Sequence, residues 1–111
     1  MFAVIYRGYI QPGLEEEYQN HWKVVATYFV QKRGALGSTL HKSAEGFWVA
    51  YSRWPDKATR DSSWPSSQEE ISSDLPPHVQ QAIQGMKRCF DLTRPFPEIC
   101  MEIKEEISSF S

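Results

Sequence analysis

The chain has 111 residues, a hydrophobic share of 41% and a formal net charge of -2. This length favours one domain with one core, which we expect over residues 1–111. Phosphate binding requires clustered Lys and Arg, and the tightest basic cluster is the pair Lys32 and Arg33, so nucleic acid and anionic membranes are excluded as main partners. No apolar run approaches the roughly 18 residues of a membrane span and no signal-peptide pattern is present, so we expect a soluble cytoplasmic protein.

The first strand and the strongest helix are predicted at the start of the chain. Residues 2–10 are rich in aromatic and β-branched side chains and end at a Pro-Gly turn. Residues 14–32 predict a helix, because acidic residues fill its first turn and basic residues its last, which suits the helix dipole. Its apolar stripe consists of Leu14, Tyr18, Trp22, Val25 and Phe29, and His21 and Tyr28 lie within it.

A β-hairpin follows, with strands at residues 38–43 and 47–54. Side chains alternate across a strand, so one face of the second strand carries Phe47, Val49 and Tyr51. The other face carries Trp48, Ala50 and Trp54. Both faces are apolar and need a cover, and a small domain has helices for only one. We therefore expect a homodimer in which a second copy covers the other face.

The second half predicts a short helix, a loop, a helix and a strand. Asp56 is a suitable N-cap for a helix over residues 57–64, and residues 65–77 are expected to form a mobile loop. Pro77 opens the next helix, and residues 99–107 alternate as a strand with one apolar face. The order predicts an α+β fold: a ferredoxin-like βαββαβ subunit with a four-stranded antiparallel sheet and helices on one face.

Several segments of the first 64 residues resemble the antibiotic biosynthesis monooxygenase superfamily. They are the run from Tyr9 to Tyr18, Trp22, residues 34–38, and the run from Gly46 to Asp56. The resemblance implies a dimeric α/β barrel of two such subunits, packed sheet to sheet. It also implies a cofactor-independent monooxygenase, if the protein is an enzyme, acting on an aromatic or quinol-type small molecule in a pocket between helix and sheet.

Three residues are candidates for catalysis. The imidazole of His21, on the helix stripe expected to face the sheet, could act as a general base, although a histidine there is also typical of a hydrogen-bonded core position. Tyr28 could donate a hydrogen bond to a phenolate or quinone oxygen. Trp64, at the end of the short helix, could form a cavity wall or simply pack.

Three further residues are candidates for substrate binding: Trp22, Tyr51 and Arg53. The two aromatic side chains offer ring surface, and the Tyr51 hydroxyl is a possible donor. Arg53 lies among apolar neighbours and could pair with an anionic substrate, or with a carboxylate of the same chain or of the dimer partner.

Other classes of site have less support. Three scattered histidines without carboxylate spacing predict no metal site, and Cys89 and Cys100, without metal or redox spacing, are expected to be buried thiols. A dimer that binds a small molecule without turning it over remains an alternative, as does a purely structural dimer. A haem-degrading relative is a further alternative, with His78 as the axial ligand beside Trp64, although Tyr6, Arg7 and Gly8 stand where such relatives carry an asparagine.

Overall fold

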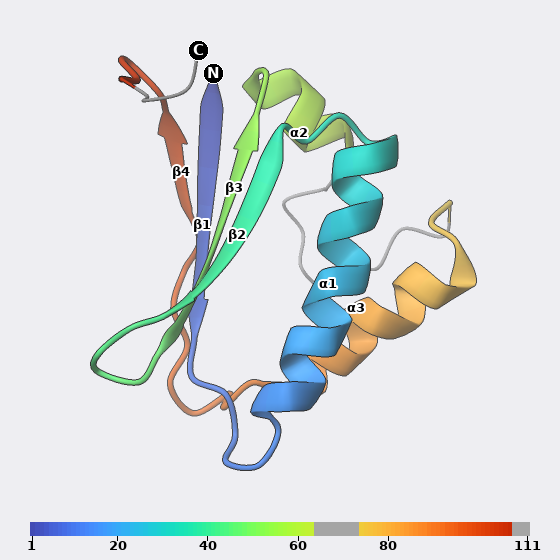
Figure 1. Ribbon diagram of the computed structural model, residues 1–111, viewed down its shortest axis with the longest axis vertical. Helices are drawn as coiled ribbons and strands as arrows, with labels where there is room; N and C mark the ends of the chain where they lie inside the picture. Colours follow the sequence, from blue (N-terminus) through green and yellow to red (C-terminus); the bar gives the residue numbers. More distant parts are fainter. Residues whose placement is uncertain (64–73, 108–111) are drawn as a thin grey trace.

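The computed structural model describes residues 1–63 and 74–107, which form one sheet and three helices (Figure 1). In chain order the elements are β1 (Phe2–Gly8), α1 (Glu15–Lys32), β2 (Gly37–Lys42), β3 (Trp48–Trp54), α2 (Lys57–Ser63), α3 (Pro77–Cys89) and β4 (Ile99–Glu102). The strands are ordered β2-β3-β1-β4, and every neighbouring pair is antiparallel. The predicted α+β ferredoxin-like fold is confirmed.

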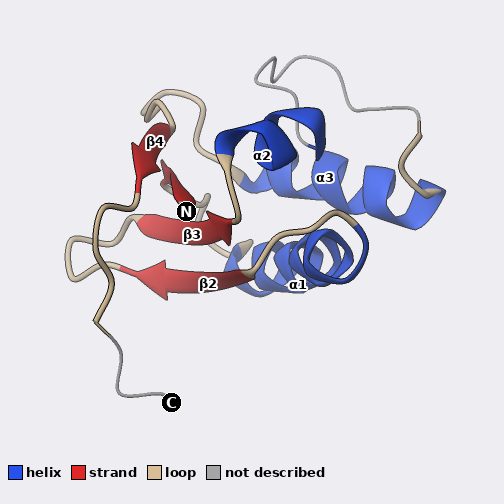
Figure 2. Cartoon of the chain, turned by 90° about the horizontal axis from the view of Figure 1, so that it is seen from above, coloured by secondary structure: helices blue, strands red, loops and turns tan. Residues whose placement is uncertain are grey.

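All three described helices lie on one face of the sheet, and none of them covers the other face, which we call the bare face (Figure 2). Along β3, Trp48, Ala50 and Trp54 are buried beneath the helices. Val49 and Tyr51, which alternate with them, are only half-buried. The prediction that both faces of this strand are apolar, with helices for one of them, is therefore confirmed.

The space between helices and sheet is filled by two clusters of apolar side chains. The larger cluster joins Val4 of β1 and Trp54 of β3 to Val25 and Phe29 of α1 and Val79 of α3. The smaller cluster consists of Ile10, Tyr18, Trp48 and Cys89. Tyr18, Val25 and Phe29 are buried, as the stripe on α1 predicts.

The last strand is shorter than expected. It ends at Glu102 because Glu102 pairs with Phe2, the first residue of β1, so residues beyond it find almost no partner on that strand. One more backbone bond forms, from the N–H of Ile103 to the carbonyl of Met1 at 2.7 Å. Residues 103–107 therefore continue past the sheet without ladder pairing.

The connections around the short helix are partly as predicted. Asp56 Oδ1 accepts the backbone N–H of Thr59 at 2.7 Å, which confirms the cap of α2. Most of the expected loop at 65–77 lies outside the described residues, but at its described end Leu75 is buried and α3 begins at Pro77. None of the described helices combines the length and the apolar character needed to cross a membrane.

Candidate functional site

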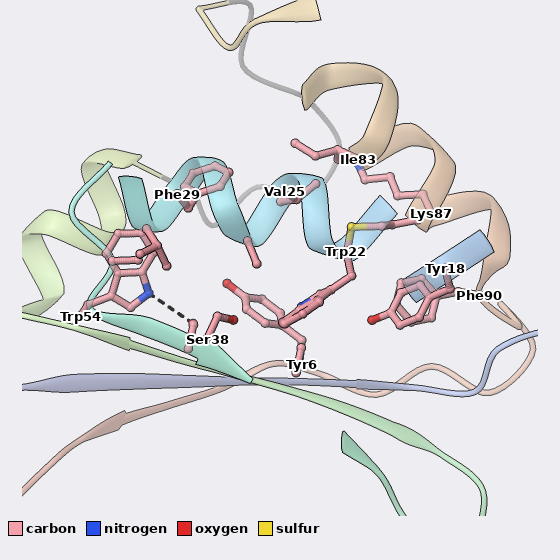
Figure 3. A pocket seen from close by; sticks show the side chains of 16 residues that line it. Tyr6, Tyr18, Trp22, Val25, Phe29, Ser38, Trp54, Ile83, Lys87 and Phe90 are labelled. Atoms are coloured by element: carbon pink, nitrogen blue, oxygen red, sulfur yellow. Dashed lines mark hydrogen bonds between the residues drawn. The ribbon is translucent and has the colours of Figure 1, made fainter. Parts of the chain in front are cut away.

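A cavity of about 160 Å³ lies between α1, α3 and the sheet (Figure 3). Side chains from both core clusters line it, so the cavity separates the two. Its aromatic wall consists of Tyr6, Tyr18, Trp22, Phe29, Trp54 and Phe90. Apolar cavities of roughly 150 Å³ accept benzene, so this volume suits one ring or a small fused ring system.

Few polar groups reach this cavity. Ser38 and Ser52 line it from the sheet, and Lys87 lines it from α3. Trp54 Nε1 donates to Ser52 Oγ at 3.2 Å, the bond that is dashed in Figure 3. Of the described residues, no histidine and no carboxylate lines the cavity. The site is therefore built to hold an apolar, flat molecule with a small number of polar contacts.

Aromatic rings pack tightly at the end of the cavity near the turn after β1. A Cβ at Gly8 would lie 2.5 Å from Cδ1 of Phe90, so only glycine lets the Phe90 ring approach the sheet there. The rings of Tyr18 and Phe90 meet edge to face with centroids 5.2 Å apart. Burial raises the pKa of Tyr18, which keeps this phenol neutral.

Tyr6 joins the cavity to a buried charged cluster. The Nη2 atom of Arg60 lies 3.1 Å from Tyr6 Oη and 2.9 Å from Glu98 Oε2, and Nη1 lies 3.3 Å from Asp61 Oδ1. Burial opposes the charge of Arg60, but the hydrogen bond to Tyr6 and the attraction of Glu98 outweigh it and raise the pKa of Arg60. The cluster places a permanent positive charge directly behind the Tyr6 hydroxyl.

A second hollow, of about 520 Å³, adjoins the first along Tyr6, Lys87 and Phe90. Its outer wall is the segment after α3, where the guanidinium of Arg7 lies 4.8 Å from the ring centre of Phe96. Tyr6 thus lies at the boundary between the two spaces.

Among the predicted site residues that the structure describes, only Trp22 lines the cavity. His21 faces α3 instead of the sheet: a Cβ at Gly85 would overlap its imidazole, and its Nε2 lies 3.7 Å from Glu17 Oε2. The expected position of His21 in the helix-sheet pocket is therefore wrong. Its side of α1 packs against α3, and the missing side chain of Gly85 makes room for the ring.

Tyr28, Tyr51 and Arg53 lie apart from the cavity. Tyr28 packs on Phe29 and accepts a hydrogen bond from Arg33 Nε at 3.5 Å. Tyr51 and Arg53 lie on the bare face, where Arg53 Nη1 pairs with Glu106 Oε1 at 3.4 Å, the intrachain ion pair that the sequence left as an alternative.

The haem alternative depends on two residues, Trp64 and His78. Trp64 lies outside the described residues. His78 is exposed in the first turn of α3 and lines neither hollow. Within residues 1–63 and 74–107, His, Cys, Asp and Glu side chains form no group that could hold a metal ion.

Sequence reasoning missed most of the cavity wall. Tyr6 could have been found, because it shares a strand face with Phe2 and Val4 at a period of two. Ser38 and Lys87 gave no such signal, because their place in the wall depends on how the edge strand and α3 pack.

The two cysteines differ in environment. Cys89 is fully buried and donates to Glu17 Oε2 at 3.4 Å, and burial raises the pKa of its thiol to about 11. Cys100 is exposed on the edge strand β4, so the expectation that both thiols are buried is correct for Cys89 and wrong for Cys100.

No protein-family model matches the sequence, and no curated protein matches it significantly. Solved structures do match. SnoaB, a cofactor-independent oxygenase from Streptomyces nogalater solved as a mutant, has a TM-score of 0.70 at 11% identity, covering 96% of this chain and 95% of that chain. An antibiotic biosynthesis monooxygenase has a TM-score of 0.69 at 16% identity, with 95% and 100% covered. The Mycobacterium tuberculosis protein Rv0793 has a TM-score of 0.68 at 19% identity, with 96% and 98% covered. Along almost its whole length, this chain has the fold of the antibiotic biosynthesis monooxygenases.

Proposed function

We propose that the protein is a small cofactor-independent monooxygenase that acts on an aromatic or quinol-type molecule in the cavity between α1, α3 and the sheet. The observation that carries this proposal is the aromatic lining of that cavity on this fold. SnoaB, which shares the fold, is a cofactor-independent oxygenase. Trp22 is proposed as a substrate-binding wall of the site.

In such a reaction the electron-rich substrate itself reduces dioxygen. For a ring methylene, one oxygen atom enters the product as a carbonyl, the other leaves with the two methylene hydrogens as water, and the substrate supplies all four electrons. The chain contributes burial, a fixed orientation of the ring and hydrogen-bond donors toward developing negative charge. Because no described histidine or carboxylate lines the cavity, the substrate gives up its proton to another group of the wall or to water.

We also propose that the protein works as a homodimer formed through the bare face of the sheet. The register of β1 with β3 and β4 places Ile5, Val49, Tyr51, Ile99 and Met101 on this face. Such an apolar surface is costly to leave in water, and a second copy of the chain is the simplest cover.

Oxygen uptake with a panel of hydroquinols and anthrols tests the activity. We expect uptake above the buffer control for at least one compound, and a loss of most of that uptake in Ser38→Leu, which fills the cavity from β2. Thr39→Leu places the same leucine side chain at the next residue, on the other face, and should retain the uptake. The same rate with and without protein would contradict the proposal.

A non-catalytic binding protein is the second candidate. The absence of a histidine or carboxylate from the described cavity wall favours it, because such groups are the usual acids and bases of enzymes. Ring compounds that bind to the cavity without any oxygen uptake would establish this function in place of the first.

A further inference from the structure

Tyr6 is held in the cavity wall by a buried cation. Arg60 is only 2% exposed, and its Nη2 lies within hydrogen-bond distance of both Tyr6 Oη and Glu98 Oε2. Nη2 carries two hydrogens, and each of these oxygens accepts one of them. The phenol oxygen of Tyr6 is therefore the acceptor in its hydrogen bond with Arg60.

The hydroxyl hydrogen of Tyr6 is left for a ligand. In the described part of the chain, the hydroxyl has no hydrogen-bond partner besides Arg60. Figure 3 shows the side chain rising from the sheet into the space below α1. An acceptor oxygen of a ligand placed opposite this hydroxyl would be bound by it.

The surroundings keep the hydroxyl a strong donor. Burial raises the pKa of Tyr6, so the phenol stays protonated at neutral pH. The positive charge of Arg60 on the phenol oxygen polarises the O–H bond, and hydrogen bonds in such chains strengthen one another.

We propose that Tyr6 recognises an acceptor oxygen, a carbonyl or a phenolate, on the aromatic ligand, and that Arg60 is a positioning residue that fixes the Tyr6 hydroxyl. The ligand's oxygen then lies against β1, and its ring lies among Trp22, Phe29 and Trp54. This assignment takes from the proposed function only that an aromatic ligand binds in this cavity. It adds the chemical class of that ligand: oxygenated rings rather than plain hydrocarbons.

The test compares two bicyclic compounds of the same shape, 1-indanone and indane, which differ by one carbonyl group. NMR titration gives a dissociation constant for each, and the ratio of the two constants measures oxygen recognition. Tyr6→Phe removes only the hydroxyl and should lower the preference for 1-indanone about three- to tenfold, with the affinity for indane unchanged. Tyr9→Phe is the matched control, because it removes the same group from a tyrosine that lines neither hollow, and it should leave the ratio unchanged.

The outcomes separate this inference from the proposed function. An unchanged ratio in Tyr6→Phe, or an equal fall in Tyr9→Phe, would overturn the assignment to Tyr6 and leave the aromatic cavity as the binding site. Binding of neither compound to the unsubstituted protein would overturn the proposed site and this assignment together.

The role of Arg60 is tested by Arg60→Lys, because lysine keeps the charge but is one atom shorter, so its ammonium group falls short of the Nη2 position that contacts both Tyr6 and Glu98. The preference for 1-indanone should fall, and in the Tyr6→Phe background Arg60→Lys should cause no further fall. Glu98→Gln removes the negative charge that pairs with Arg60 but keeps an acceptor oxygen at this position, and it should keep the preference. A further fall in the double variant, or an equal fall in Glu98→Gln, would overturn the positioning role.

Discussion

The two faces of the sheet are made from the same strands and both carry apolar side chains, but the described helices cover only one of them. On the helix side, Trp48, Ala50 and Trp54 of β3 are buried, and a cavity remains between two packed clusters. On the bare side, Val49 and Tyr51 are half-buried, although nothing packs on them from the helices. The alternation of side chains along the sequence of a strand therefore shows that both faces are apolar, but it does not show what covers each face.

The difference separates two kinds of occupant. The helix side leaves a partly open cavity suited to a ring, and its few polar groups are anchored by neighbours such as Arg60. The bare face offers apolar side chains such as Val49 and Tyr51 that suit packing against another sheet. This difference supports the proposed small molecule on the first face and the proposed second copy of the chain on the second.

Removing Arg60 should have the largest effect on the helix side. Arg60→Met removes the cation that pairs with Glu98 and the donor to the Tyr6 hydroxyl, and we expect a loss of about 3 kcal/mol in the free energy of unfolding, because one side of a buried ion pair is lost. Urea denaturation measures this loss. Arg94→Met, which removes an exposed arginine paired with Asp91, should leave the unfolding free energy nearly unchanged. Equal effects of the two substitutions would contradict the structural role of Arg60.

The fold was accessible from the sequence because its signals are local. The turn after β1, the charged ends of α1, the two-sided strand β3 and the cap Asp56 each depend on residues close together in the chain. The end of β4 was not accessible, because it depends on where β1 offers a partner.

The site was mostly inaccessible, since its contacts join distant residues. Arg60 lies in a short helix that looks solvated by sequence, yet it reaches Tyr6 across 54 positions and Glu98 across 38. His21 was expected to face the sheet because it lies within the apolar stripe of α1, but it faces α3 instead. Gly85 of α3 decides that the imidazole packs between helices, and no periodicity within α1 reports that contact.

The reactivity of the two cysteines compares the buried interior with the edge strand of the sheet, and we expect a smaller effect here than for Arg60. In the folded protein, Cys89 should react with iodoacetamide at least about a hundredfold more slowly than exposed Cys100, because its thiol is buried and its pKa is raised to about 11. Since the thiolate is the reactive form, the slow rate should rise with pH up to that value.

Mass spectrometry of the labelled protein measures both rates. The variant Cys100→Ser gives the rate of the buried thiol of Cys89 alone. Similar rates for the two cysteines in the folded protein would show that the helix side is open to solvent, contrary to the burial of Cys89.

The account depends most on the claim that a second copy covers the bare face, and sedimentation equilibrium at micromolar concentration measures this directly. We predict the mass of two 12.9 kDa chains, a shift to one chain in Val49→Lys, which places a charge within that face, and no shift in Thr27→Lys on the exposed side of α1. A folded, unsubstituted protein with the mass of a single chain would contradict the account.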